Sequence, residues 1–243
     1  SLMAALTASV IPAVSAALVR RDSLHTSRVV NSSFRVTALL SFPMGFGLWA
    51  LAEPIFRLLY SRFDASVGAP LLATLGIASI FVCLMLITNA ILQAYGHVNT
   101  PIFTMLIGGV VKIFLNYHLV AIPEVNIQGA PVGTLVCFAL TALLNLIIIW
   151  HIAERKPNYL SFFLKPFLAS IIMAFSARAS YALLVQLLRP EGSKMLALIC
   201  LGGAIGIAAI IYFILVLILR IITREDLLLL PKGEKLANLL KIH

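Results

Sequence analysis

Lys112 is the residue of this chain with the clearest capacity for chemistry, because it lies in the middle of an apolar run over residues 100–122. Thr104, Gly108, Lys112 and Asn116 recur at every fourth position, so a helix would place them on one face as a polar, small-residue stripe. A lone lysine at the centre of a membrane helix costs about 2.5–3.5 kcal/mol on insertion scales. We therefore expect the stripe to face a water-filled cavity, where Lys112 would contact an anionic substrate.

The alternative for Lys112 is a structural ion pair with a carboxylate on another helix. No Asp or Glu lies deep within any apolar run of this chain, so such a partner cannot come from these residues. This absence favours the interpretation that Lys112 binds substrate.

Two neighbouring apolar runs carry further polar residues. Asn89 and Gln93 are four positions apart, and Thr134, Thr141 and Asn145 fall close to one face of a helix. These side chains would either line the same cavity as Lys112 or join helices by hydrogen bonds, which contribute on average about 0.6 kcal/mol each in a membrane. The sequence leaves both interpretations open.

Arg178 is a second cation near the middle of an apolar run, with Ser170 two turns earlier on the same side. It would contact a phosphate or a lipid head group, or else reach a hydrated groove between helices. With it, the candidate substrate-binding residues are Lys112, Asn116, Asn89, Gln93, Asn145 and Arg178.

Catalytic motifs are missing from the sequence. It has no Walker A sequence, HExxH or GxSxG, and its five histidines are scattered near the ends of the apolar runs. An enzyme acting on phosphates would normally need carboxylates to hold a metal ion. We expect no enzyme activity, no metal site and no cofactor.

The elements that must position these residues are membrane helices. The chain is 61% hydrophobic and only 11% charged, with a mean hydropathy of +1.06, whereas soluble domains carry about 25% charged residues. A bilayer-spanning helix needs about 20 mostly apolar residues. The sequence predicts an all-α integral membrane protein with about seven spans, at residues 1–19, 34–52, 67–95, 100–122, 127–152, 162–188 and 194–222.

Basic residues predict the orientation of these spans. Lys and Arg are concentrated after the first span, after the fifth and in the C-terminal tail, which places these segments and the C-terminus in the cytoplasm. The net charge of +9 therefore reflects topology and not nucleic-acid binding. Residues 224–243 combine leucines with lysines, which predicts an amphipathic helix on the cytoplasmic leaflet; a disordered tail is the alternative.

The chain opens inside an apolar stretch, without a basic segment or a cleavage signal before it. This start predicts that the sequence is part of a longer protein, either naturally or through artificial truncation.

Three stretches together resemble a known family. They are residues 5–15 with the basic loop that follows, residues 89–101, and residues 112–116 followed by 127–130. Their order and spacing resemble the polysaccharide and lipid II flippases of the multidrug/oligosaccharidyl-lipid/polysaccharide exporter superfamily, and most of all the stage V sporulation protein B group of Gram-positive bacteria. The resemblance covers nearly the whole chain, although no single motif is long.

This resemblance implies a domain organisation. The chain would correspond to spans eight to fourteen of a fourteen-span protein of the bacterial cytoplasmic membrane. Residues 1–154 would supply five helices of the second lobe, residues 155–223 two additional C-terminal helices, and residues 224–243 the cytoplasmic tail. The missing N-terminal lobe would be an essential partner, because much of the cationic cavity of the family lies there.

The resemblance also implies a function. The two lobes would rock around an undecaprenyl-pyrophosphate-linked oligosaccharide or peptidoglycan precursor and carry it across the membrane by alternating access. Lys112 and Asn116 would face the cavity, and the last two spans, including Arg178, would hold the polyprenyl tail. Membrane lipids are further expected partners, and nucleic acid is not.

Two other functions remain open at this point. A multidrug antiporter of the same superfamily would be expected to carry acidic residues in its cavity, where this chain has a lysine. A seven-span receptor or scaffold would be expected to begin with its own start and an extracellular tail.

Overall fold

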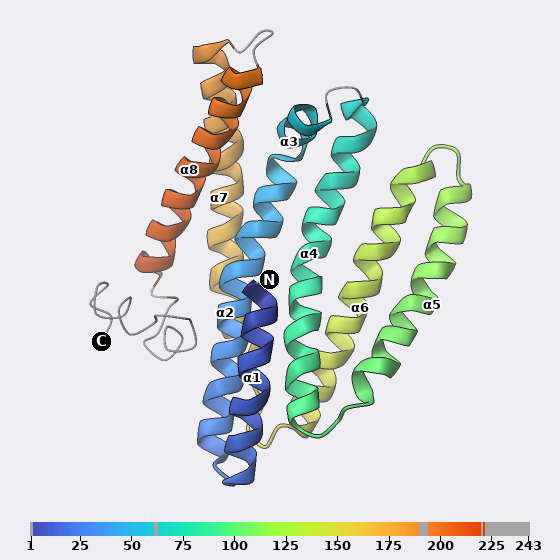
Figure 1. Ribbon diagram of the computed structural model, residues 1–243, viewed down its shortest axis with the longest axis vertical. Helices are drawn as coiled ribbons and strands as arrows, with labels where there is room; N and C mark the ends of the chain where they lie inside the picture. The colour runs from blue at the N-terminus through green and yellow to red at the C-terminus, as the bar shows by residue number, and fades with distance from the viewer. Residues whose placement is uncertain (1, 61–62, 190–193, 220, 222–243) are drawn as a thin grey trace.

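The computed structural model describes residues 2–60, 63–189, 194–219 and 221, and within these residues all regular structure is helical (Figure 1). The elements in chain order are α1 (Leu2–Val19), α2 (Ser23–Ala50), α3 (Ala52–Leu59), α4 (Ala65–Ala94), α5 (Thr100–Ala121), the short 3₁₀ helix η1 (Asn126–Gln128), α6 (Gly129–Ile152), α7 (Tyr159–Leu188) and α8 (Lys194–Ile218). The predicted amphipathic tail, residues 224–243, lies outside the described residues.

Five helices, α4 to α8, are long and apolar enough to cross a membrane, and the bent pair α2–α3 raises the count to six. The all-α membrane fold is therefore confirmed. Together with α1, whose described apolar stretch Leu6–Val19 is shorter than this length criterion, these helices correspond in position to the runs predicted from sequence. In Figure 1 α1 covers only part of the height of α2.

The long helices run alternately up and down (Figure 1). The connections after α1, α4 and α6 lie at one end of the bundle, called here the α1–α2 end. The elbow α2–α3, the connection after α5 and the C-terminal end of α7 lie at the other, called here the α3 end. The two basic connections predicted from sequence thus share one end of the molecule, because the chain passes along the bundle an even number of times between them: through the pair α2–α3, α4, α5 and α6.

The centre of the bundle is built by α1, α2, α4 and α6. Val10, Phe34, Ile91 and Ile149 are each fully buried and belong to one apolar cluster. Helix α7 packs against α2 through aromatic rings, with Phe34 and Tyr159 edge to face at 5.4 Å. Helix α8 pairs with α7, whereas α5 packs almost entirely on α6 and forms the opposite edge of the bundle in Figure 1.

The sequence predicts a kink or break at Pro43, and α2 continues without a break through this residue to Ala50. At Leu51 the chain bends, and α3 leaves α2 at 69°. Backbone packing supports α2 here, since a Cβ on Gly45 would lie 2.8 Å from the carbonyl oxygen of Gly76 on α4. Neighbouring helices of this kind are what allow proline inside a membrane helix.

Candidate functional site

Asn145 is the centre of a buried hydrogen-bond network that joins three helices. Its side chain on α6 is fully buried, and its Nδ2 donates to Thr88 Oγ1 at 3.0 Å and to Asn89 Oδ1 at 2.7 Å, both on α4. Its Oδ1 accepts from Thr104 Oγ1 on α5 at 2.8 Å. One amide thus fixes the relative positions of α4, α5 and α6.

Thr141 extends this network by one turn of α6. Its hydroxyl donates to the backbone oxygen of Cys137 at 2.9 Å and lies 3.4 Å from the backbone oxygen of Thr104. Asn145 and Thr141 therefore act as links between helices, the second of the two interpretations that the sequence left open. Thr134 takes no part, because its hydroxyl bonds to Ala130 of its own helix.

Thr88 is the member of this network that the sequence analysis missed. It is fully buried, and its hydroxyl also donates to the carbonyl oxygen of Leu84 within α4. A threonine that satisfies its own helix gives no signal in a sequence, and only its position next to Asn89 could have pointed to it.

The stripe of α5 faces α6 along its first half. Thr104 and Gly108 are buried, and a Cβ on Gly108 would lie 2.5 Å from Thr141 Oγ1 and 2.9 Å from the backbone oxygen of Cys137. The expectation that the whole stripe faces a water-filled cavity is wrong for these two residues. Small and hydroxyl-bearing residues allow two membrane helices to approach closely, and they serve that purpose here.

Asn116 also lies against α6, at the position of Gly133. A Cβ on Gly133 would overlap Asn116 Oδ1, so a larger residue at position 133 would displace this side chain. The Oδ1 atom is buried and has no hydrogen-bond partner among the described residues. Asn116 therefore retains an unused acceptor one turn from Lys112.

Lys112 occupies the middle of α5, two turns beyond Thr104 on the same stripe, and is half-buried. In the described part of the chain its ammonium group has neither an ion pair nor a hydrogen bond. The same residues contain no group of His, Cys, Asp or Glu that could hold a metal ion. Lys112 is thus an uncompensated cation within a membrane-spanning helix.

The other predicted residues are only partly gathered around Lys112. Asn89 is half-buried and held by Asn145, and its Nδ2 lies 4.0 Å from Met105 Sδ. Gln93 is exposed one turn nearer to the α1–α2 end. The structure therefore brings Asn89 and Asn145 into contact and leaves Gln93 one turn away on α4. Lys112 lies nearer to the α3 end, on α5.

Arg178 is not part of this group. It is exposed on α7 and lines a groove of about 740 Å³ at the α3 end, between α7, the elbow α2–α3 and the start of α4. The remaining polar residues of this groove were not singled out from sequence, and they are Glu53, Arg57, Asp64, Ser66 and Tyr181.

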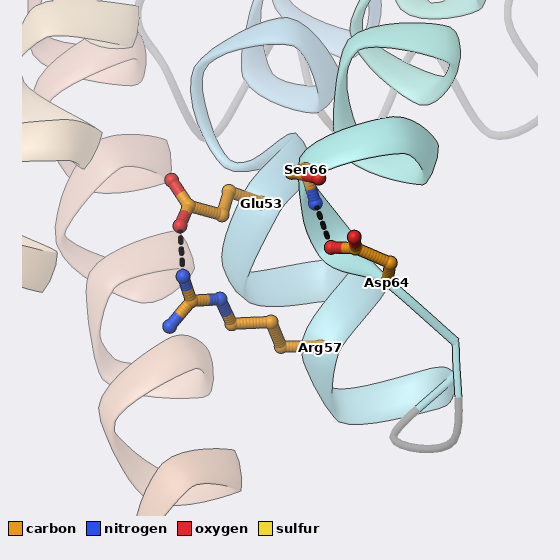
Figure 2. A network of polar contacts seen from close by, with 4 residues as sticks. All are labelled: Glu53, Arg57, Asp64 and Ser66. Carbon is orange, nitrogen blue, oxygen red and sulfur yellow. Dashed lines mark hydrogen bonds and ion pairs between the residues drawn. The ribbon is translucent and has the colours of Figure 1, made fainter.

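Two local interactions order the polar wall of the groove (Figure 2). Arg57 and Glu53, one turn apart on α3, form an ion pair at 2.6 Å. Asp64 caps α4 by accepting from the backbone N–H of Ser66 at 2.8 Å, and this bond holds the pKa of the Asp64 carboxyl below its ordinary value. Arg178 has no ion pair or hydrogen bond within the described residues.

The chain is similar in sequence to known membrane proteins. Residues 2–224 match the family model described as lipid II flippase MurJ. The chain is 25% identical over 234 residues to the uncharacterized membrane protein YabM of Bacillus subtilis (strain 168), covering 96% of this chain and 42% of that protein. It is 29% identical over 171 residues to the lipid II flippase MurJ of Burkholderia cenocepacia, covering 68% of this chain and 33% of that protein.

Among solved structures, an inward-facing multidrug resistance MATE family transporter of the MOP superfamily has a similar fold. The TM-score is 0.55 at 16% sequence identity, over 89% of this chain and 52% of that one. At this identity the likeness concerns the fold alone. The chain spans less than half the length of the curated relatives above.

Proposed function

This chain belongs to the lipid II flippase MurJ family, and on that premise we propose that it supplies the second half of a flippase. The cargo is an undecaprenyl-pyrophosphate-linked oligosaccharide or a peptidoglycan precursor of the lipid II type. The protein moves this cargo across the bacterial cytoplasmic membrane by alternating access. The missing N-terminal lobe supplies the rest of the cavity, and the C-terminus lies in the cytoplasm.

The observation that carries this proposal is the uncompensated charge of Lys112. A cation without a carboxylate partner is unfavourable inside a membrane unless it faces water or an anion. A pyrophosphate head group provides that anion and moves with the cargo. Helix α5 packs almost entirely on α6, so its remaining surface is available to the other lobe and to the substrate between the lobes.

The polar residues around Lys112 take different roles in this proposal. Lys112 binds phosphate, and the amide of Asn116, whose Oδ1 is buried against Gly133, lies one turn away on the same stripe. Asn89 and Gln93 contact hydroxyl and amide groups of the head group. Asn145 acts through Asn89, which it holds at 2.7 Å, and so serves as a positioning residue.

The network of Asn145 also suits a rocking mechanism. Alternating access requires helices that move as a rigid body around the substrate. Hydrogen bonds from Asn145 to α4 and α5 tie these helices to α6. The polyprenyl tail of the cargo follows the lipid-facing surface of α7 and α8.

A multidrug antiporter is the second candidate, because a MATE family transporter shares the fold. Cationic drugs require acidic residues in the cavity. The described acidic residues of this chain lie in connections or at helix ends: Asp22, Glu53, Asp64, Glu124 and Glu154. The presence of Lys112 and the lack of acidic residues in the middle of the described spans favour the anionic cargo. The match to the lipid II flippase family model favours a flippase over a receptor or scaffold.

The proposal is tested by replacing Lys112 in the full-length protein. We expect Lys112→Ala to abolish growth when the variant is the only flippase in a strain depleted of its own. Lys112→Arg, which keeps the charge, should restore part of this growth. Arg20→Ala removes an exposed cation in the connection after α1 and is the control.

Membrane levels of all three variants must equal the wild type. Growth of the Lys112→Ala strain at the wild-type rate would refute the role of Lys112. Failure of the wild-type protein to transport lipid II in vesicles would point to a different cargo.

A further inference from the structure

The groove around Arg178 is separate from the cargo site proposed above, and its chemistry is different. Its walls are apolar over most of their length and include Trp49 and Val185. Its charged residues are confined to α3, the start of α4 and one position of α7. A groove of this composition fits an amphipathic molecule.

The position of the groove relates it to the surface of the membrane. Helix α3 is short, leaves α2 at 69° and carries a stacked pair of exposed or half-exposed aromatic rings, Phe56 and Tyr60, 5.1 Å apart. Aromatic side chains on a bent, amphipathic segment mark the level of the lipid head groups. Because Glu53 and Arg57 of α3 line the same groove as Arg178, Arg178 lies within reach of that level.

The charged side chains that line the groove carry no net charge together. Two basic and two acidic side chains line it. Arg57 and Glu53 neutralise each other, as Figure 2 shows, which leaves one cation, Arg178, and one anion, Asp64. The carboxylate of Asp64 accepts from Ser66 and keeps free lone pairs.

We propose that this groove binds the head group of a zwitterionic aminophospholipid, phosphatidylethanolamine, from the leaflet at the α3 end. The phosphate meets the guanidinium of Arg178, and the ammonium group meets the carboxylate of Asp64. One acyl chain follows the apolar wall beside Trp49. An anionic lipid such as phosphatidylglycerol would match Arg178 equally well but would place no positive charge opposite Asp64.

Such a lipid would lie beside the contact between α7 and the elbow α2–α3, where Leu51 packs in one apolar cluster with Met173 and Ala177. Farther from this end, α7 contacts α2 through Phe42 and Phe163 at 6.2 Å. Movement of α7 relative to α2 would therefore change the shape of the groove. Lipid binding in the groove is expected to influence conformational change without forming part of the cargo path.

The test uses the full-length protein in nanodiscs of phosphatidylethanolamine and phosphatidylglycerol at equal amounts, followed by native mass spectrometry of the released protein. The wild type is expected to retain phosphatidylethanolamine in preference. Arg178→Ala should reduce the retained phospholipid about tenfold. Asp64→Asn preserves the helix cap but removes the charge, and it should abolish the preference while phospholipid is still retained.

The controls separate this proposal from the proposed function. Arg20→Ala removes an exposed arginine at the other end of the molecule and should retain lipid as the wild type does. Lys112→Ala should also leave lipid retention unchanged, since it concerns the cargo. Ala182→Trp fills the groove without altering charge and should reduce retention as Arg178→Ala does.

Three results would overturn the proposal. One is equal retention of phosphatidylethanolamine by the wild type and by both Arg178→Ala and Ala182→Trp. Another is a wild-type preference for phosphatidylglycerol. The third is loss of the lipid signal in both single variants, Lys112→Ala and Arg178→Ala. This result would make the groove part of the cargo path.

Discussion

Asn145 on α6 donates a hydrogen bond of 2.7 Å to Asn89 on α4, across 56 positions of the chain. The pair is connected to α5 through Thr104, so one buried amide ties together the three helices nearest to Lys112. In a bilayer these bonds have no water to replace them. The site proposed for an anionic cargo thus lies beside a polar framework in which Asn145, Thr88 and Thr104 are buried.

Replacing Asn145 by Ala is expected to lower the thermal stability of the full-length protein. The change leaves Thr88, Asn89 and Thr104 without their shared partner, and a destabilisation of about 1–3 kcal/mol follows from such buried unpaired groups. The measurement is the melting temperature in detergent. Unfolding is detected with a thiol-reactive dye or by fluorescence-detected size-exclusion chromatography. Gln93→Ala, exposed on α4, serves as the control and should melt as the wild type does. Equal melting of both variants would show that the network does not stabilise the fold.

Gly108 and Gly109 provide a test of helix packing at adjacent positions. A Cβ at Gly108 would collide with Thr141 and with the backbone of Cys137, whereas a Cβ at Gly109 would meet no atom within 4 Å. We expect Gly108→Ala to destabilise the protein by about 1–3 kcal/mol, as overpacking does. Gly109→Ala should be neutral or slightly stabilising, because alanine favours a helix more than glycine does. The same melting assay measures both, and a reversed order would contradict the α5–α6 contact.

The positions of the connections predict a pattern of labelling. His25 and Asn158 are exposed at the α1–α2 end, and Glu124 is exposed at the α3 end. A cysteine at position 25 or 158 is expected to react with an impermeant maleimide only after the cells are opened. A cysteine at position 124 should react in intact cells.

The parent protein without an added cysteine sets the background of this experiment; in this chain Cys137 and Cys200 are buried and Cys83 is half-buried. Labelling of positions 25 and 158 from opposite sides would contradict the fold. Labelling of all three positions in the reverse sense would contradict only the orientation predicted from Lys and Arg.

Much of the architecture could be predicted from the sequence for a physical reason. A membrane helix satisfies its own backbone, so its existence depends on local hydrophobicity alone. The runs at residues 67–95, 100–122 and 127–152 accordingly become α4, α5 and α6 with small shifts at their ends. The run at 34–52 is only part of α2, because the polar first turns of that helix, from Ser23 on, pack inside the protein.

The candidate site could be predicted less completely, and the reason is that helical spacing gives a face but not its neighbour. The four-residue spacing of Thr104, Gly108, Lys112 and Asn116 was sufficient to place them on one side of α5. It could not tell whether that side meets water or another helix. The structure shows that it meets α6, because Gly108 packs closely against Thr141 and Asn116 packs closely against Gly133.

By itself, the sequence determined that this protein lies in a membrane, that it is built of helices, and that Lys112 is a cation without an acidic partner in the spans. Only the tertiary structure decided that Asn145 joins α4 and α5 and that Arg178 belongs to a groove at the α3 end. The difference is physical. Insertion of a helix into lipid depends on the hydrophobicity of that segment alone, whereas contacts between helices depend on side chains far apart in the chain.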